Sequence, residues 1–305
     1  MYLLPPGIEV FERGWLSANN ILHFGNQDVS LVDTGYCTHQ TMTLSLVESA
    51  LNKHGLSALN KVVNTHLHSD HCGGNALLAQ TFGCEIEIPA AEALAVQDWN
   101  QDLLSYQNLG QECPPFVHHG LLIPGQEILL GRYVWKILAA PGHDPHSVML
   151  YQAEHRILIS ADALWEDGFG VIFPELWGES GFEEVAQTLD LIEGLSIDLV
   201  IPGHGKPFTN IATSITTARS RLDYLASDPD RNARHGAKVL LKYKLLDWRS
   251  QKIDAVNDWI KKTPALKSAA KQLNLDQEEF SHWLVQALVK SGAATLDGQH
   301  LIDKA

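Results

Sequence analysis

The densest group of side chains that could do chemistry in this 305-residue chain lies between positions 66 and 71. It contains three histidines and one aspartate, namely His66, His68, Asp70 and His71. Imidazole and carboxylate together form the usual ligand set of zinc, and also of iron and manganese. We therefore interpret this stretch as part of a metal centre rather than as an ordinary polar loop.

Four ligands from one short loop cannot all face a single ion. Alternate residues of an extended segment point in the same direction, so His66 and His68 can share one metal ion. Asp70 and His71 are better placed to hold a second ion. The spacing therefore predicts two metal sites close together.

Three loops further along the chain each offer one more candidate, directly after a stretch that reads as a strand. The candidates are His143 in Pro-Gly-His, Asp162 in Ser-Ala-Asp, and His204 in Pro-Gly-His-Gly. Glycine beside each histidine allows the backbone to turn sharply close to a ligand. A single Gly-His pair indicates only a turn, but ligand residues at four strand ends indicate one shared centre.

The elements that must position these residues follow from the hydrophobic periodicity. Strands are expected at residues 8–11, 20–24, 29–32, 62–63, 84–88, 128–130, 133–138, 148–151, 157–160 and 199–201. Helices are expected at residues 38–54, 75–82 and 90–99, and after 180–183, where Ser-Gly-Phe-Glu has the pattern of a capping box. Residues 101–124 read as an irregular lid or binding loop. The economical fold is a layered α/β domain in which helices cover the faces of sheets.

The order of these candidates resembles the ligand pattern of the metallo-β-lactamase-fold hydrolase superfamily. The resemblance covers roughly the first 225 residues, and it implies a four-layer αββα sandwich with the metal ions at one edge. It also divides the seven candidates between two ions. The first ion would be held by His66, His68 and His143, the second by Asp70, His71 and His204, with Asp162 bridging the two.

The resemblance also implies a role for Asp33 and a subgroup of the superfamily from the presence of Asp162. Asp33, in Val-Asp-Thr-Gly, matches the first motif of the superfamily and would orient the histidine loop by hydrogen bonding. True β-lactamases generally lack the bridging carboxylate, so the presence of Asp162 points towards hydrolases that are similar to glyoxalase II.

The chemistry that the resemblance implies is hydrolysis. Two divalent cations, with zinc expected first and iron or manganese as alternatives, would share a water molecule and lower its pKa to about 7. The metal-bridging hydroxide would attack a carbonyl or phosphoryl centre, and Asp70 would orient it and accept its proton. No Gly-x-Ser-x-Gly sequence indicates a serine nucleophile.

Two aromatic segments are candidates for the walls of a substrate pocket. Residues 163–177 follow Asp162 and hold four large aromatic side chains, for which a pocket wall and core filling are equally good interpretations. Residues 99–119 form the second candidate and include His118 and His119, which we expect to be ordinary loop histidines. No clear cluster of Lys and Arg is present to hold the carboxylates of glutathione. An ester, thioester or lactone of a small, partly apolar acyl compound is therefore the expected substrate.

The composition changes after residue 227, which divides the chain into an expected catalytic domain at 1–227 and a C-terminal domain at 228–305. Helical patterns at 233–248, 253–262, 264–273 and 276–291, with a hairpin at 294–302, resemble a winged helix. Its lysines are offset by acidic residues, which disfavours a nucleic-acid reader. We interpret the region as a packing or dimerisation module that covers the active site.

The composition narrows the class of partner. A net charge of −14 argues against nonspecific nucleic-acid binding, and a small-molecule substrate suits it better. The four cysteines lack Cys-x-x-Cys spacing and are expected to be reduced thiols. Neither a signal-peptide pattern nor an apolar run approaching the ~18 residues of a membrane span is present, so we expect a cytoplasmic protein that works without a membrane.

Three alternatives to the hydrolase of a small acyl compound stay open. The winged-helix pattern allows an endoribonuclease or phosphodiesterase. The same ligands would also suit an iron-dependent oxygen or redox protein. A DNA-binding regulator with a metal-sensing domain is the third alternative, and the acidic charge balance disfavours it.

Overall fold

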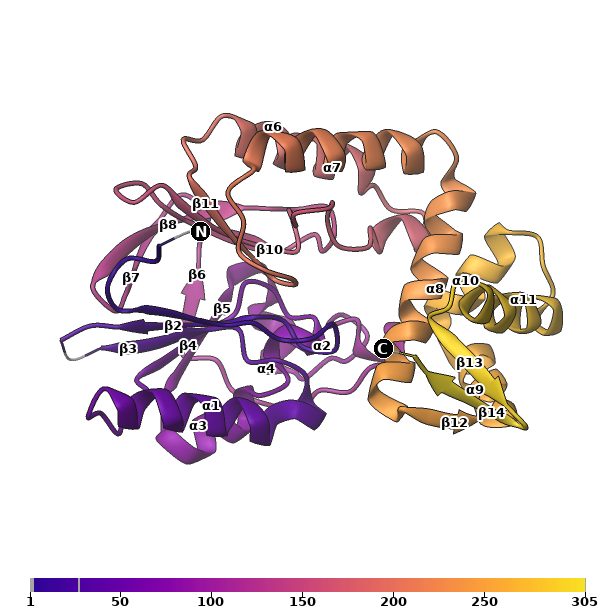
Figure 1. The fold of residues 1–305 in the computed structure, drawn as a ribbon, viewed down its shortest axis with the longest axis horizontal. Coiled ribbons are helices and arrows are strands. Elements are labelled where there is room, and N and C mark those ends of the chain that lie inside the picture. The colour runs from indigo at the N-terminus through magenta and orange to yellow at the C-terminus, as the bar shows by residue number, and fades with distance from the viewer. Residues whose placement is uncertain (1–2, 27, 305) are drawn as a thin grey trace.

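The computed structural model describes residues 3–26 and 28–304 and contains two β-sheets that pack face to face (Figure 1). Six strands form the first sheet, in the order β1-β2-β3-β4-β5-β6. Their bounds are Ile8–Phe11, Asn20–Phe24, Val29–Val32, Lys61–Val63, Glu85–Pro89 and Gly120–Leu122. The first three strands are antiparallel, whereas β3 to β6 run parallel. The carboxyl ends of β3 and β4 therefore meet at the same edge.

The second sheet has five strands in the order β11-β10-β9-β8-β7. In chain order from β7 to β11, the strands span Glu127–Leu130, Tyr133–Ala139, Val148–Gln152, Ile157–Ala161 and Leu199–Pro202. Strands β10 and β11 are parallel, and β9 is antiparallel to both β8 and β10. The carboxyl ends of β8, β10 and β11 consequently lie at one edge, where loops from three distant parts of the chain come together.

Alternation along the strands explains why the two sheets pack together. On β2, Ile21 and His23 face the second sheet, whereas Leu22 and Phe24 face the helices outside the first sheet. Successive side chains of a strand point to opposite faces, so a strand that is apolar on both faces needs cover on both. The layer between the sheets is apolar and includes the fully buried Trp135 of β8.

Helices cover the outer faces of both sheets. Figure 1 shows α1 and α3 below the first sheet and α6 and α7 above the second. The helices α1, α3 and α4 span Gln40–Lys53, Asn75–Phe82 and Ala93–Gln97, and α6 and α7 span Phe182–Glu193 and Ile211–Ala226. Each set contributes apolar side chains to a buried cluster with its sheet. The expected four-layer αββα sandwich is confirmed.

The C-terminal region is mainly helical, as expected. Its helices α8 to α11 span Pro229–Trp248, Ile253–Lys262, Pro264–Gln272 and Gln277–Lys290. A small sheet, ordered β12-β14-β13, is formed by Ser250–Lys252, His300–Asp303 and Ala294–Asp297 respectively. The assignment of residues 228–305 to a separate winged-helix domain stays a prediction.

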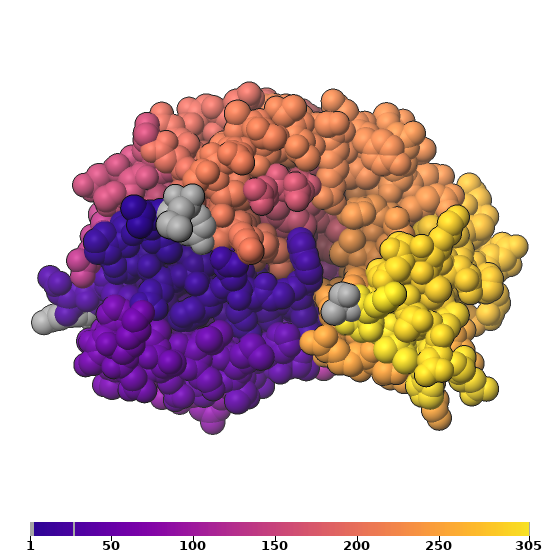
Figure 2. All heavy atoms as spheres, in the orientation of Figure 1, coloured from indigo at the N-terminus to yellow at the C-terminus, as the bar shows by residue number. Residues whose placement is uncertain are grey.

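The long helix α8 shares its hydrophobic core with the rest of the molecule. Val171, Phe173 and Leu176, from the loop after β10, lie in one buried cluster with side chains of α8, α10 and α11. Figure 2 shows the surface on which the indigo N-terminal part, orange α7–α8 and the yellow C-terminal elements meet. The C-terminal helices are therefore packed against the sandwich rather than tethered beside it.

Two local expectations are wrong. Residues 101–124 are not wholly irregular, because they contain α5 (Tyr106–Leu109) and the edge strand β6. No capping box opens α6, because its cap residue, Gly181, has no side chain to accept a hydrogen bond. The Glu175 carboxylate, from the preceding 3-10 turn Pro174–Trp177, instead accepts hydrogen bonds from the Gly181 and Phe182 amides.

Short helical segments complete the fold. Two further 3-10 turns, Cys37–His39 and Ala90–Glu92, precede α1 and α4. The helical turn α2, Ser69–Cys72, lies inside the histidine loop. None of the helices in the described part of the chain combines the length and the apolar character needed to cross a membrane.

Candidate metal centre

The structure brings all seven candidate ligand residues together at the edge where the carboxyl ends of the strands meet. The histidine loop follows β4, and later loops follow β8, β10 and β11. Groups in which potential ligand atoms lie within 4.8 Å of one another are His66–His68–His143, His66–His71–Asp162 and Asp70–His71–His204. The seven residues therefore form one continuous cluster of donors.

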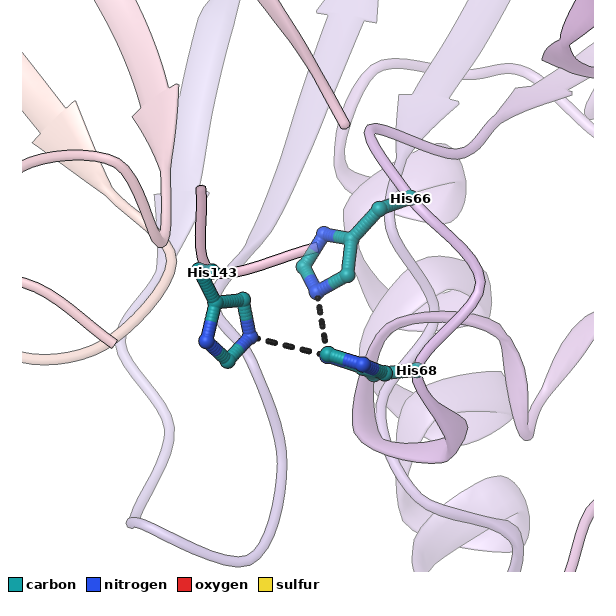
Figure 3. A group of neighbouring side chains, drawn as sticks. All are labelled: His66, His68 and His143. Carbon is teal, nitrogen blue, oxygen red and sulfur yellow. Dashed lines mark hydrogen bonds between the residues drawn. The ribbon is translucent and has the colours of Figure 1, made fainter. Parts of the chain in front are cut away.

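The first group consists of three imidazoles whose rings point toward one another (Figure 3). His66 Nε2 lies 3.1 Å from His68 Nδ1, which lies 2.8 Å from His143 Nε2. The second nitrogen of His143, Nδ1, faces the carbonyl oxygen of Val171 and is its hydrogen-bond donor. His143 Nε2 consequently presents a lone pair to the other two rings.

Burial keeps the three imidazoles of this group neutral. It lowers the pKa of His68 to about 4, and burial together with His68 lowers that of His143 to about 4. The pKa of His66 is held well below its usual value by burial and by His71 and His68. Neutral imidazole is the form that binds a metal ion. The converging nitrogens therefore fit a cation between them.

The second group combines a carboxylate with two imidazoles. Asp70 Oδ2 lies 3.1 Å from His204 Nε2. His71 Nε2 is buried and has no hydrogen-bond partner among the described residues. Buried polar atoms are nearly always paired, so an unpaired nitrogen next to a carboxylate and a second imidazole fits a cation ligand.

Asp162 lies between the two groups. Its Oδ2 is 3.4 Å from His143 Nε2 and 3.8 Å from His204 Nε2, and its Oδ1 is 3.5 Å from His71 Nε2. Burial would raise the pKa of this carboxyl, but His204 and His71 outweigh burial and hold it well below the usual value. An ionised carboxylate that reaches nitrogens of both groups is placed to bridge two cations.

The histidine loop is not extended throughout, which corrects the simple alternation argument. His66 to His68 are outside regular structure, but the chain enters the helical turn α2 at Ser69. Asp70 and His71 are therefore adjacent residues of a helix and point about 100° apart around its axis. In a strand they would point to opposite faces. That turn aims both side chains at the second group.

Asp33 holds the second group from behind, as expected. Its carboxylate accepts hydrogen bonds from the Thr65 amide at 2.9 Å and the Thr65 hydroxyl at 2.8 Å. It also lies 2.8 Å from His71 Nδ1. Burial opposes a proton on His71, but the Asp33 and Asp162 carboxylates outweigh it and hold its pKa well above the usual value. Asp33 thereby fixes Nδ1 as the donor and turns Nε2 towards the centre.

Two glycines leave room for the ligands. A Cβ atom on Gly203 would lie 2.2 Å from Asp162 Oδ1, and one on Gly170 would lie 2.5 Å from His143 Nδ1. Any side chain at either position would displace a candidate ligand, either Asp162 or His143. Gly203 directly precedes His204, so the Pro-Gly-His-Gly sequence both positions the histidine and leaves space for the Asp162 carboxylate.

A cavity of about 680 Å³ opens beside the first group and is lined by His68, His143, Phe173 and Trp177 among others. Helix α10 closes part of it through Pro264, Ala265 and Ser268. Of the aromatic residues after Asp162, Phe169 is buried in the core, Phe173 is buried in a hydrophobic cluster and also lines the cavity, and Trp177 lines the cavity. The loop therefore both fills the core and forms a cavity wall.

Sequence reasoning missed two acidic residues in this cavity region. Asp144 is buried and its Oδ2 lies 3.7 Å from His68 Nε2. Glu92 is buried and lies 2.7 Å from His146 Nδ1. Asp144 directly follows His143, and that adjacency was the only sequence signal for it.

Three other residues that could bind a metal ion, Cys72, His119 and His118, lie outside the ligand groups of the described residues. The Cys72 thiol donates to the Leu67 and His68 carbonyl oxygens, so it packs as expected. His119 Nδ1 accepts a hydrogen bond from the Ile86 amide, so this ring nitrogen is used in a contact with strand β5. His118 belongs to none of the metal-ligand groups in the described residues.

Comparisons with known proteins agree with this geometry. The family model of the metallo-beta-lactamase superfamily matches residues 13–204. A hydroxyacylglutathione hydrolase of Rhizobium etli is 26% identical over 115 residues, which are 38% of this chain and 38% of that enzyme. A probable metallo-hydrolase of Methanocaldococcus jannaschii is 25% identical over 198 residues, 62% of this chain and 88% of that protein.

The fold match extends beyond the sandwich. The crystal structure of a metallo-beta-lactamase family protein from Thermus thermophilus superposes with a TM-score of 0.58 at 18% identity, covering 99% of this chain and 100% of the other. At that identity the match concerns the fold alone, and it includes the C-terminal helices.

Proposed function

The chain belongs to the metallo-β-lactamase superfamily and is a metal-dependent hydrolase, and on that premise we propose that it hydrolyses a small ester, thioester or lactone. The observation that carries this proposal is the continuous cluster of seven donors, in which Asp162 reaches nitrogens of both groups. A hydroxyacylglutathione is a thioester, so the relative from Rhizobium etli supports the thioester among these three classes.

The proposed ligands are the seven residues in two sets. His66, His68 and His143 would hold one divalent ion, and Asp70, His71 and His204 the other, with Asp162 shared. Zinc is the proposed metal, because imidazole and carboxylate ligands suit it. When bound, the pair of ions supplies a water with a lowered pKa and positive charge for the developing oxyanion.

Asp70 is the proposed proton acceptor. It faces a small cavity of about 80 Å³ that is also lined by His68, His143, Asp162 and His204. Burial would raise the pKa of Asp70, but the hydrogen bond from His204 and the charge of His71 outweigh burial and lower it. The carboxylate is therefore ionised and positioned to orient a water and to take its proton.

Aromatic side chains form part of the wall of the small cavity. Trp15, Phe173 and Tyr243 line it, and Tyr243 comes from α8 of the C-terminal region. The Tyr243 hydroxyl lies within 3.5 Å of the Ser69 hydroxyl and of the Leu16 carbonyl oxygen. In this proposal α8 forms one wall of the active site, so the C-terminal region is needed for the chemistry.

Turnover of a substrate panel tests the proposal. We expect metal-loaded protein to hydrolyse acyl esters, thioesters or lactones, and we expect His66→Ala and Asp162→Ala to lose that turnover. The matched control is His118→Ala, which lies outside every ligand group and should keep it. Full activity in either ligand variant would refute the mechanism. Cleavage of single-stranded RNA without any hydrolysis of the acyl panel would refute the substrate class.

A further inference from the structure

A second cavity, of about 460 Å³, lies on the other side of the centre, against the helices α7 and α8. Trp15, Trp165 and Tyr243 line both this cavity and the small cavity that holds the candidate ligands. Trp15 stacks on the ring of His204 with centroids 5.5 Å apart, and Trp165 donates to Asp162 Oδ1 at 3.2 Å. The rings of Trp15 and Trp165 pack edge to face with centroids 5.4 Å apart, so a substrate that reaches from the centre into the second cavity would pass beside this pair rather than between its rings.

Four basic side chains line this cavity, and one of them, Lys242, is ion-paired with Asp303, which leaves Arg221, His235 and Lys238. Arg221 comes from α7, and His235 and Lys238 come from successive turns of α8. Arg221 Nη2 lies 2.7 Å from His235 Nε2, and its guanidinium lies 5.1 Å from the centre of the Phe169 ring. The guanidinium is thus fixed in place by a ring on α8 and by a ring in the loop after Asp162.

Among residues 3–26 and 28–304, no carboxylate lies within ion-pair distance of Arg221 or Lys238. Arg219, two positions earlier on α7, differs in this respect, because it forms ion pairs with both Asp190 and Glu193. The chain has 36 acidic and 22 basic residues, so partners for cations are abundant elsewhere. A half-buried guanidinium without a counter-ion is costly unless an anion binds there.

His235 acts as an acceptor in this group rather than as a third cation. Burial, with Arg221 and Lys238 nearby, lowers its pKa to about 4. Its neutral ring therefore accepts a hydrogen bond from Arg221 and leaves the other guanidinium N–H groups free. The fixed planar fork of arginine matches a carboxylate or a phosphate, and lysine adds a mobile point charge.

We propose that Arg221 and Lys238 bind an anionic group of the substrate, with His235 as the positioning residue for Arg221. The substrate class is then an acyl thioester or ester whose far end carries a carboxylate or a phosphate, with an apolar stretch between that end and the reacting carbonyl. This inference rests on the proposed function, because it places the anionic end of the same substrate in the second cavity.

Matched thioesters that differ only in charge test the inference. In the first pair the charge lies on the thiol, and the two substrates are the butyryl thioesters of mercaptopropionate and of mercaptopropionamide. A third substrate, the butyryl thioester of mercaptoethyl phosphate, carries a phosphate in place of the carboxylate. A second pair carries the charge on the acyl group, as succinyl and succinamoyl thioesters of one neutral thiol. We expect kcat/KM to favour the charged member of at least one pair about tenfold or more, mainly through KM. The preferred anion then distinguishes a carboxylate substrate from a phosphate substrate.

Variants assign the preference to the basic group. We expect Arg221→Gln and Lys238→Gln each to lower kcat/KM for the preferred charged thioester about tenfold to a hundredfold, with the neutral twin unchanged within about twofold. Arg221→Lys should keep part of the preference because it keeps the charge. The matched control is Arg219→Gln, on the same helix, which should leave kcat/KM unchanged for both the charged and the neutral substrate.

The outcomes separate this inference from the proposed function. Equal kcat/KM for both members of every pair, or equal losses for charged and neutral substrates in the variants, would overturn the inference and leave the hydrolase intact. No hydrolysis of any ester, thioester or lactone would overturn the proposed function and this inference with it, whereas hydrolysis confined to lactones would overturn this inference alone. Lys238→Gln keeps the test valid if Arg221→Gln does not fold, because Lys238 has no structural hydrogen bond in the described residues.

Discussion

Histidines at the centre differ in charge because their neighbours differ. His66, His68 and His143 face one another and are buried, which favours the neutral ring in each. His71 is equally buried, but two carboxylates face it and raise its pKa. Three rings are therefore ready to bind a cation without releasing a proton, whereas His71 is oriented by the Asp33 carboxylate.

The role of Asp33 leads to a prediction about a residue that touches no substrate. Asp33→Asn keeps the size of the side chain but removes the charge that orients His71. We expect metal affinity and kcat to fall about tenfold to a hundredfold, with little change in KM. Metal titration followed by steady-state kinetics measures both quantities.

A surface aspartate provides the control for this change. Asp198→Asn removes a carboxylate that pairs with Arg156 far from the centre, and it should leave metal affinity unchanged. Wild-type metal affinity in Asp33→Asn would show that the hydrogen bond to His71 is structural only.

At the scale of elements, the centre exists because strands of two sheets end at one edge. β3 and β4 position Asp33 and the histidine loop, and β8, β10 and β11 position the remaining candidate ligands. Each loop must approach the others closely, which is why glycines lie beside the ligands rather than only at surface turns. The loops, not the helices, therefore carry the precise geometry.

A methyl group at Gly203 tests that close approach. In Gly203→Ala the new Cβ would lie 2.2 Å from Asp162 Oδ1, so the carboxylate or the loop must move. We expect kcat to fall about a hundredfold, because a shift of about 1 Å at a reacting group has that cost. The control Gly14→Ala adds a methyl group where no atom lies within 4 Å and should keep wild-type kcat.

For both variants, steady-state kinetics measures kcat and a thermal melt measures the melting temperature. A loss of kcat in Gly203→Ala with an unchanged melting temperature would locate the effect at the centre. Wild-type kcat in Gly203→Ala would show that the loop after β11 adapts without cost, contrary to this account.

The strand ends could be predicted from sequence because alternation and glycine punctuation are local signals. Every expected strand of the sandwich is present, and the expected ligands follow β4, β8, β10 and β11. The turn α2 was missed because its four residues, Ser69–Cys72, are too few to show a helical period. The cap of α6 was predicted wrongly because Glu175 reaches it from a preceding turn.

Contacts between distant elements could not be predicted in the same way. The sequence shows no cluster of Lys and Arg, yet Arg221 and Lys238 lie on one cavity wall because α7 and α8 pack together. Asp144 and Glu92 meet near His146 for the same reason, since 52 positions separate the two acids along the chain. Such juxtapositions depend on helix packing and loop paths, which leave no local pattern.

At the scale of the whole molecule, the layer between the sheets contains an unusual residue for a core. His23 of β2 is fully buried against Trp135, and neither of its ring nitrogens has a hydrogen-bond partner in the described part of the chain. Burial lowers the pKa of His23 to about 3. The fold therefore holds the neutral ring, whereas the unfolded chain binds a proton below about pH 6.5.

This difference predicts acid instability. As pH falls from about 6.5 towards 3, residue 23 binds a proton in the unfolded state but not in the folded state, so the contribution of His23 to the free energy of unfolding decreases by on the order of 5 kcal/mol at most. His23→Phe removes the titrating group and its unpaired nitrogens, so it should flatten this slope and raise stability at pH 7. Urea unfolding at several pH values measures both effects.

The control for the acid slope is a histidine outside the core. His118→Gln alters a loop residue and should keep the wild-type dependence on pH. An unchanged slope in His23→Phe, or a loss of stability at pH 7, would show that other groups control acid unfolding and that the ring makes favourable contacts in the core.

The central claim is that the seven residues form one centre for two metal ions. Elemental analysis of the purified protein by plasma mass spectrometry tests it most directly, with His66→Ala, His204→Ala and the control His118→Ala measured alongside. We expect about two divalent ions per wild-type chain, zinc foremost, about one in each ligand variant and about two in the control. No bound metal in the wild type after reconstitution, or an unchanged content in both ligand variants, would contradict it.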